Sequence, residues 1–289
     1  MKNQVVYLLS NDSFLPYLVV SLHTLRQHWE GKVTVFAWEQ AFPLAEELGK
    51  DMRLYVDVKK REPIEKGGRK KWQFLDKIHL MSTLDTDAAL YLDADTTVHN
   101  PIDSIFDAVA EHGFVSTQFN DWTTGMRRIQ KRVKKLTGIE RIDQKLVQRV
   151  LRGAYPSPNG GVFACRPDSL VLPVWYEWTK AAMSIFIPDE TVLHLFQPSF
   201  FRGVGILEGG RFNCSPKFQP KNLKDEEVVI YHHHGSSAVR PQKSPRSYAM
   251  WYPLYQDCML QNVGGMAEWS CKIKNKWLDR LREKEKNNG

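Results

Sequence analysis

Two carboxylates stand directly after an apolar run in the first third of the chain. Residues 88–92 are apolar and lead into Asp93 and Asp95, which are spaced i, i+2. Such a run is typical of a strand buried on both faces of a parallel sheet, and these sheets present ligand-binding groups at the carboxyl ends of their strands. Paired carboxylates there would suit Mg²⁺ or Mn²⁺, which neutralise a diphosphate. The tripeptide alone is also typical of a solvated turn.

A lysine and a run of histidines are further candidates for binding a phosphate or a metal ion. Lys77 shares the apolar stripe of the helix expected at residues 74–84, where it either snorkels to solvent or points at a phosphate. Three histidines, 232–234, follow the strand expected at residues 228–231, and at most two can share a face because strand side chains alternate. One imidazole beside two carboxylates would favour Mn²⁺ over Mg²⁺, because nitrogen is the softer donor.

Two expected turns could contact a nucleotide or a sugar. The residues Ser10, Asn11 and Asp12 end the first strand, where sheets of this kind place a nucleotide, although Asp12 or Ser13 could equally cap the next helix. A tight loop is expected at residues 156–161. Its glycines would permit close approach of a ligand, or would simply form a turn.

The periodicity of apolar residues indicates alternating strands and helices, which is typical of a doubly wound α/β sheet. Strands are expected at residues 5–9, 33–38, 54–58, 88–92, 114–117, 162–165 and 228–231. Helices are expected at residues 15–29, 43–48, 74–84, 101–110, 167–183, 188–196, 250–260 and 269–281. Gly31 is expected to cap the first helix and Asn100 the helix at residues 101–110.

In this order the motifs resemble family 8 glycosyltransferases of the GT-A fold, the group that includes glycogenin and bacterial galactosyltransferases. The resemblance runs from about residue 5 to residue 235. The matching motifs are Asn11-Asp12-Ser13-Phe14-Leu15, Lys77-Ile78-His79, Tyr91-Leu92-Asp93-Ala94-Asp95-Thr96, Asn159-Gly160-Gly161-Val162-Phe163, Asp189-Glu190 and His232-His233-His234-Gly235. The resemblance implies a Rossmann-like α/β domain with a mostly parallel central sheet and C-terminal helices.

The resemblance also implies a reaction and its site: a hexose moves from a UDP-sugar to an acceptor hydroxyl, with retained anomeric configuration and with Mn²⁺ or Mg²⁺ as cofactor. The implied metal ligands are Asp93, Asp95 and His232, with His234 as the fallback. Lys77 would support the departing diphosphate, and Asp189 and Glu190 would lie beside the reacting sugar. The other implied donor contacts are Ser10, Asn11, Asp12, Ala94, Asn159, Gly160, Gly161, Gly235 and Arg240.

The chain departs from the family pattern at two places. The family commonly has a lysine three residues after the glycine of its histidine motif, whereas here Arg240-Pro241 follows Gly235 two residues late. Either Arg240 takes that role or the phosphate contact is lost. The family usually has Asp-Gln where this chain has Asp189-Glu190. A carboxylate at position 190 is a candidate nucleophile for a covalent glycosyl intermediate, and front-face departure and attack is the alternative route.

Charge is concentrated in one segment. The 289 residues carry a net charge of +7, with 42% hydrophobic and 25% charged residues, as in ordinary soluble globular proteins. Residues 121–152 hold ten Lys/Arg against three Asp/Glu, and residues 125–152 are expected to form two basic helices broken near Thr137-Gly138. They match nothing in the family. The segment suits an anionic acceptor or an anionic membrane surface, or it is simply a solvated helical face.

We expect residues 1–240 to form the catalytic domain, with the basic insertion at about 121–155, and residues 241–289 to form a packed helical extension with a frayed tail. The longest apolar-rich stretch, residues 14–22, is too short to span a bilayer, and a strand begins close to Met1. The four cysteines lie far apart. These features predict a cytoplasmic protein, with peripheral contact to a membrane as an open alternative.

Three other functions are alternatives to glycosyl transfer. A sugar-nucleotide pyrophosphorylase should carry a glycine-rich basic loop after its first strand, which residues 10–13 are not. A nucleic-acid-binding protein using residues 121–152 would make the Asp-Xaa-Asp and His-Xaa-Xaa-Gly motifs coincidences, so nucleic acid is not the expected partner. A degenerate transferase that only binds its donor stays open because of the departure at Arg240.

Overall fold

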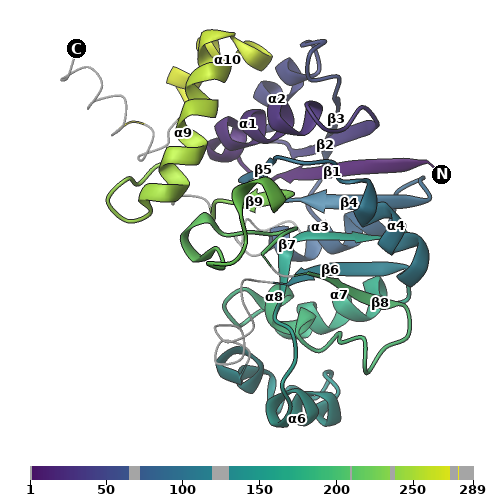
Figure 1. Cartoon of the computed structure of the whole chain (residues 1–289). Helices are drawn as coiled ribbons and strands as arrows, with labels where there is room; N and C mark the ends of the chain where they lie inside the picture. The colour runs from purple at the N-terminus through teal and green to yellow at the C-terminus, as the bar shows by residue number, and fades with distance from the viewer. Residues whose placement is uncertain are drawn as a thin grey trace.

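A seven-stranded mixed sheet forms the centre of the molecule (Figure 1). The computed structural model describes residues 2–64, 72–118, 130–208, 210–234, 238–273 and 279. The strand order is β3-β2-β1-β4-β7-β6-β8, and a second sheet pairs β5 with β9. The strands are β1 (Asn3–Leu9), β2 (Lys32–Trp38), β3 (Asp57–Arg61), β4 (Ala88–Leu92), β5 (Thr96–Val98), β6 (Phe114–Gln118), β7 (Pro158–Cys165), β8 (Val204–Leu207) and β9 (Ile230–His232).

Most neighbouring strands of the large sheet run parallel. β1 pairs in parallel with β2 and β4, β2 with β3, and β6 with β8, whereas β7 runs antiparallel to β4 and β6. The mostly parallel α/β architecture is therefore confirmed. Strand β5 was not expected. It follows Asp95 and pairs antiparallel with β9.

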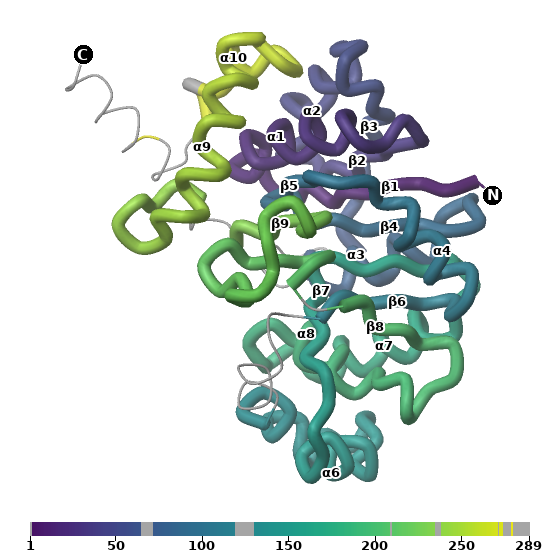
Figure 2. Tube along the Cα trace, viewed as in Figure 1, coloured from purple at the N-terminus to yellow at the C-terminus, as the bar shows by residue number. Residues whose placement is uncertain are grey.

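Helices cover both faces of the large sheet. One face packs against α1 (Leu15–Arg26), α2 (Phe42–Leu48), α4 (Asp103–His112), α9 (Pro245–Leu260) and α10 (Met266–Trp269). The other packs against α3 (Trp72–Ser82), α6 (Gln144–Arg152), α7 (Val171–Ala181) and α8 (Pro188–Leu193). Figure 2 shows α6 and α10 at opposite ends of the molecule.

The central strands are buried on both sides, as the apolar run predicted. In β1, Val5 and Tyr7 pack in the core beneath α1, while Val6 packs in the core beneath α3. In β4, Leu90 and Tyr91 divide between the two cores in the same way. Because every residue of β4 is buried, the strand is held rigidly up to the point where Asp93 follows it.

Three expected boundaries were wrong for local reasons. The first helix ends at Arg26 and not near Gly31, because the Arg26 guanidinium donates to the carbonyls of Trp29 and Gly31 and holds that stretch as a turn. The third strand begins at Asp57, since Tyr55 has φ of 43° and cannot be part of an extended strand. Asn100 does not cap α4, because its side chain donates to the carbonyls of residues 226 and 228.

The basic segment is described from residue 130 onward. Residues 130–133 are helical, Lys134–Leu136 form a 3₁₀ turn, and α6 follows after a break at Thr137 and Gly138, where the break was expected. Residues 125–129 of the predicted first helix lie outside the described residues. Val133 and Leu136 are fully buried and anchor the segment on the core shared with α8.

The C-terminal helix α9 packs on α1, where the rings of Tyr17 and Trp251 lie 5.0 Å apart. The prediction of a helix at residues 269–281 is wrong for residues 270–273, which the structure describes. α10 ends at Trp269, and Ser270–Lys272 form a 3₁₀ turn. Residues 274–278 and 280–289, including the predicted frayed tail, lie outside the described residues, and the division into two units stays a prediction.

Within the described residues, no helix combines the length and apolar character that are needed to cross a bilayer.

Candidate active site

Three potential metal ligands meet at the junction of the two sheets. Asp93 and Asp95 follow β4, and His232 ends β9, opposite Thr96 of β5. The His232 Nε2 atom lies 3.2 Å from Asp95 Oδ1 and 3.8 Å from Asp93 Oδ2, and one ligand atom from each residue falls within 4.8 Å of the others. Burial alone lowers the pKa of His232, but the carboxylates of Asp95 and Asp93 outweigh it and raise that pKa.

The three consecutive histidines divide between two environments. His233 is buried, bonded to Thr97 at 3.0 Å and to Ser247 at 2.9 Å, and burial lowers its pKa to about 3. His232 faces the carboxylates, and the fallback ligand His234 lies beside it with ring centroids 4.2 Å apart. The alternation expected of a strand therefore separates His233 from the site and leaves His232 against Asp93 and Asp95.

A side-chain amide fixes the orientation of the His232 ring. The Nδ1 atom of His232 lies 3.0 Å from Asn213 Oδ1, which can only accept, so Nδ1 carries the hydrogen. Nε2 is then the nitrogen that faces the carboxylates, and in the neutral ring it would carry the lone pair that a metal ligand needs. Asn213 is held in turn by its own donation to Thr117 Oγ1 at 2.8 Å and to Asn159 Oδ1 at 3.0 Å.

Two adjacent glycines let the backbone pass against these side chains. A Cβ on Gly161 would lie 2.3 Å from Cε1 of His232 and 2.6 Å from Oδ2 of Asp93. A Cβ on Gly160 would lie 3.1 Å from Asp189 Oδ2 and 3.2 Å from Lys77 Nζ. These residues were expected in a loop, but β7 already begins at residue 158, because Asn159 pairs with Thr117 across an irregularity in the β6–β7 ladder.

Lys77 and Asp189 form a buried ion pair beside the carboxylates. Lys77 Nζ lies 2.5 Å from Asp189 Oδ2 and donates to the carbonyl of Gly160 at 2.8 Å. Burial lowers the pKa of Lys77, but Asp189 and Asp93 reverse this and raise it, so the ammonium stays charged. Burial raises the pKa of Asp189, against the opposing effect of Lys77. Its other oxygen, Oδ1, is buried and has no hydrogen-bond partner among the described residues.

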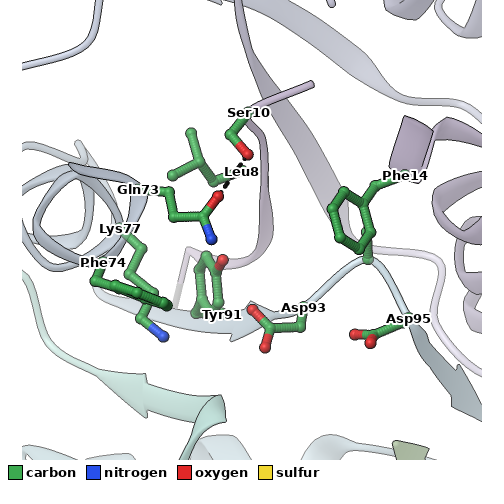
Figure 3. A pocket seen from close by; sticks show the side chains of 10 residues that line it. Leu8, Ser10, Phe14, Gln73, Phe74, Lys77, Tyr91, Asp93 and Asp95 are labelled. Carbon is green, nitrogen blue, oxygen red and sulfur yellow. Dashed lines mark hydrogen bonds between the residues drawn. The ribbon is translucent and has the colours of Figure 1, made fainter. Parts of the chain in front are cut away.

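A pocket of about 190 Å³ opens at this point. In Figure 3, Lys77, Tyr91 and Asp93 lie along one side and Phe14 faces them. Ser10 donates to Gln73 Oε1 at 2.7 Å across the pocket wall. The lining residues are Leu8, Ser10, Phe14, Gln73, Phe74, Lys77, Tyr91, Asp93, Ala94 and Asp95. The pocket thus joins the end of β1, helix α3 and the carboxylates after β4.

Glu190 lies next to this pair and is engaged at both oxygens. Arg132 donates to Glu190 Oε1, and Asn159 Nδ2 donates to Oε2 at 3.2 Å. Asn159 also accepts from the Gly161 backbone N–H at 2.7 Å. The side chains of Arg132 and Glu190 are 17% and 8% exposed, so this is a mostly buried ion pair.

The structure brings together most, but not all, of the expected site residues. Asn11 and Asp12 do not line the pocket; Asn11 accepts from the Ser13 backbone N–H at 3.0 Å and caps the turn at Asp12–Phe14, the role expected of Asp12 or Ser13. Arg240 lies in the turn before α9 and does not line the pocket either. Gly235 lies outside the described residues.

Sequence reasoning missed Asn213 and Arg132. Asn213 lies in an irregular stretch, and it reaches His232 only because Cys214 forms a parallel bridge with Tyr231 of β9. No local pattern could have found it. Arg132 is one of many cations in its segment, and its position just before the apolar Val133 was the only available signal.

Comparison with solved structures finds glycosyltransferases. The galactosyltransferase LgtC, in complex with donor and acceptor sugar analogues, matches with a TM-score of 0.61 and 15% identity, over 88% of this chain and 95% of that one. An active-site glutamine-to-glutamate variant of LgtC gives 0.60, with the same identity and coverage. Mouse xyloside xylosyltransferase 1 gives 0.56 and 12% identity, over 82% of this chain and 99% of that one. The chain has the GT-A glycosyltransferase fold. This confirms the fold that the resemblance to family 8 implied. No protein-family model and no curated protein sequence matches the chain.

Proposed function

We propose that the protein is a metal-dependent, retaining glycosyltransferase that moves a hexose from a UDP-sugar to an acceptor hydroxyl. One observation carries the proposal. Asp93, Asp95 and His232 come from distant parts of the chain, yet their ligand atoms lie within 4.8 Å of one another at the mouth of a pocket that also holds Lys77. Open α/β sheets bind nucleotide ligands at the carboxyl ends of their strands, which is where Asp93 and Asp95 lie.

The donor set fits a divalent cation. Two carboxylates and one imidazole form a hard, mixed oxygen and nitrogen site that suits Mn²⁺, with Mg²⁺ as the alternative. Asn213 supports this fit because it leaves the Nε2 lone pair of His232 free to bind. A bound cation would supply positive charge that stabilises the departing diphosphate.

Lys77 and Asp189 would then contact different parts of the donor. The charged Lys77 ammonium lines the pocket and adds a second cation where negative charge develops on the β-phosphate. The Oδ1 atom of Asp189, which is buried and has no hydrogen-bond partner among the described residues, is an acceptor that a sugar hydroxyl would satisfy. Gly160 leaves room for the ring, because it has no side chain against Asp189 and Lys77. Ser10 at the end of β1 would contact the nucleoside side.

In the proposed reaction the bond between C1 of the sugar and the β-phosphate oxygen breaks, and its electron pair leaves with UDP. The acceptor oxygen forms the new bond to C1, and its proton passes to the departing phosphate. We favour this front-face route over a covalent intermediate, because both oxygens of Glu190 already bind Arg132 and Asn159. Glu190 as a nucleophile would first have to give up the contact with Arg132.

The acceptor is proposed to be a glycan or another hydroxyl compound that carries negative charge. Helix α6 places Lys145, Arg149 and Arg152 around a surface hollow that also includes Tyr155, and no acidic residue lines it. The guanidinium of Arg149 lies 4.4 Å from the ring centre of Phe200, which fixes its position. Tyr155 is four residues from Asn159, so their Cα atoms are at most about 14 Å apart. An oligosaccharide can span that distance.

The deciding experiment screens UDP-glucose, UDP-galactose and their N-acetyl forms for hydrolysis with and without Mn²⁺. We expect one donor to be hydrolysed only with metal, and Asp95→Ala to abolish this while the protein stays folded by circular dichroism. Turnover at the wild-type rate by chelated or Asp95→Ala protein would refute the mechanism. Donor binding without hydrolysis or transfer would identify a binding-only protein. A cytoplasmic location, with contact to an anionic membrane, stays a prediction.

A further inference from the structure

A continuous hydrogen-bonded path joins the basic segment to the candidate metal site. It begins at Arg132, which binds Glu190, and continues from Glu190 to Asn159 at 3.2 Å. Asn159 Oδ1 accepts from Asn213 at 3.0 Å, and Asn213 Oδ1 accepts from His232 at 3.0 Å. Four side-chain contacts therefore connect the helical residues 130–133 with the imidazole that faces Asp93 and Asp95.

Arg132 is held in place independently of this path. The residue that follows it, Val133, is fully buried in the core shared with α8, and so is Leu136 one turn later. The backbone at residue 132 is therefore fixed by apolar packing, and its side chain is directed at Glu190. Substitution of the guanidinium should leave the segment in place and remove only its charge and its hydrogen bonds.

We propose that Arg132 is a positioning residue for glycosyl transfer. It neutralises Glu190 and holds this carboxylate against Asn159, so that Asn159 and Asn213 keep the His232 ring in its metal-binding orientation. The inference rests on the proposed function and adds to it a residue from the basic segment. Arg132 acts on Glu190 within the protein, and we propose no contact between Arg132 and the donor or the acceptor.

The physical reason is the cost of a buried charge that loses a charged partner. Without Arg132, the carboxylate of Glu190 stays mostly buried beside the carboxylate of Asp189 but no longer has the guanidinium that holds it in place. It would rotate toward water or toward the ammonium of Lys77, and either movement releases Asn159. Replacing Glu190 by glutamine removes the charge but keeps an oxygen that Asn159 can bind. With an uncharged side chain at position 190, the contact with Asn159 should therefore survive the loss of Arg132.

A double-mutant cycle tests this coupling. The variants are Arg132→Met, Glu190→Gln and the double variant, and Lys135→Met serves as the matched control because it removes an exposed cation from the same segment. The assay is Mn²⁺-dependent hydrolysis of the UDP-sugar without an acceptor, so any effect of the cations on acceptor binding is absent. Mn²⁺ affinity, from calorimetry or electron paramagnetic resonance, provides a second readout that needs no turnover.

Partners outside the first coordination shell commonly affect activity or metal affinity by about 10–100-fold. We expect Arg132→Met to lower hydrolysis and Mn²⁺ affinity by about tenfold, the double variant to recover most of that loss, and Lys135→Met to match the wild type. Wild-type behaviour of Arg132→Met, or a double variant as impaired as the product of the single variants, would overturn the inference. If Glu190→Gln alone impairs hydrolysis more than Arg132→Met does, the inference also fails and Glu190 acts directly. Wild-type protein that neither binds Mn²⁺ nor hydrolyses any donor would refute the proposed function itself, which is a separate outcome.

Discussion

Gly161 leaves no room for a side chain beside His232: a Cβ there would lie 2.3 Å from the imidazole Cε1 and 2.6 Å from Asp93 Oδ2. The strand β7 and two of the three candidate metal ligands therefore fit together only because residue 161 is glycine. Its backbone carbonyl also accepts from the Asp93 N–H at 2.8 Å, which ties β7 to the end of β4.

We predict that Gly161→Ala displaces His232 or Asp93 and weakens Mn²⁺ binding by at least about tenfold, with hydrolysis falling in proportion. Calorimetric titration with Mn²⁺ measures the effect, and circular dichroism checks the fold. Gly49→Ala is the matched control, because a Cβ there meets its neighbours at 3.4 Å or more, away from the site. Unchanged Mn²⁺ affinity in Gly161→Ala would show that the metal does not bind between these residues.

Asn213 should control the tautomer of His232. We predict that Asn213→Ala lowers Mn²⁺ affinity by about 10–100-fold, because the Nδ1 hydrogen loses its acceptor and the ring is free to turn. Gln144→Ala also removes a partly buried side-chain amide, but one whose hydrogen bonds among the described residues all go to backbone groups of the basic segment. It should lower the melting temperature and leave Mn²⁺ affinity intact. Equal Mn²⁺ affinities in the two variants would contradict the assigned role.

The hollow beside α6 should respond to the charge of the acceptor. We predict that neutral replacement of Lys145, Arg149 and Arg152 raises KM for an anionic acceptor several-fold at low salt, while acceptor-free hydrolysis of the donor is unchanged. The effect should fade as salt is added, because exposed charges are screened.

A second triple variant keeps the change in net charge but moves it elsewhere: Lys217→Gln, Lys221→Gln and Lys224→Gln, all exposed. If both variants raise KM equally, the effect is one of total charge and not of the hollow.

Sedimentation with vesicles of anionic lipid at low and high salt tests the alternative, in which the hollow binds an anionic membrane. Salt-sensitive vesicle binding that depends on Lys145, Arg149 and Arg152, with no effect on KM, would assign the hollow to a membrane.

Asp51 should make folding sensitive to acid. Its carboxylate accepts from Arg53 and from the Gly264 backbone N–H at 2.7 Å, and the hydrogen bond from Arg53 is the main cause that lowers its pKa to about 2. The folded pKa is below the unfolded value of about 3.9, so the stabilisation is present above about pH 4 and is lost as the pH falls toward 2.

We therefore predict that Asp51→Asn lowers the free energy of unfolding by about 1–2 kcal/mol at neutral pH, measured by urea denaturation. Its stability should fall less steeply than that of the wild type between pH 4 and pH 2. Asp57→Asn, at a half-exposed carboxylate, is the control and should change neither quantity. If the stability of wild-type and Asp51→Asn protein falls equally steeply between pH 4 and pH 2, Asp51 is not the group that makes folding sensitive to acid.

The sequence determined the features that depend on near neighbours along the chain. The apolar run before Asp93 made β4 a strand buried on both faces, and it placed Asp93 and Asp95 at its end. The stripe shared by Lys77 and its apolar neighbours put that lysine on the sheet side of α3, where it is buried. These properties follow from periods of two and 3.6 residues, which a single segment contains.

Tertiary structure alone decided which residues from different segments meet. The approach of His232 to Asp93 and Asp95 depends on the pairing of β5 with β9, two strands about 130 residues apart in sequence. Asn213 and Arg132 enter the site through contacts with His232 and Glu190 that no local period encodes. The antiparallel direction of β7 likewise depends on its partners β4 and β6. Such pairings are selected by the packing of the whole core, because each segment alone satisfies its own pattern equally well in several arrangements.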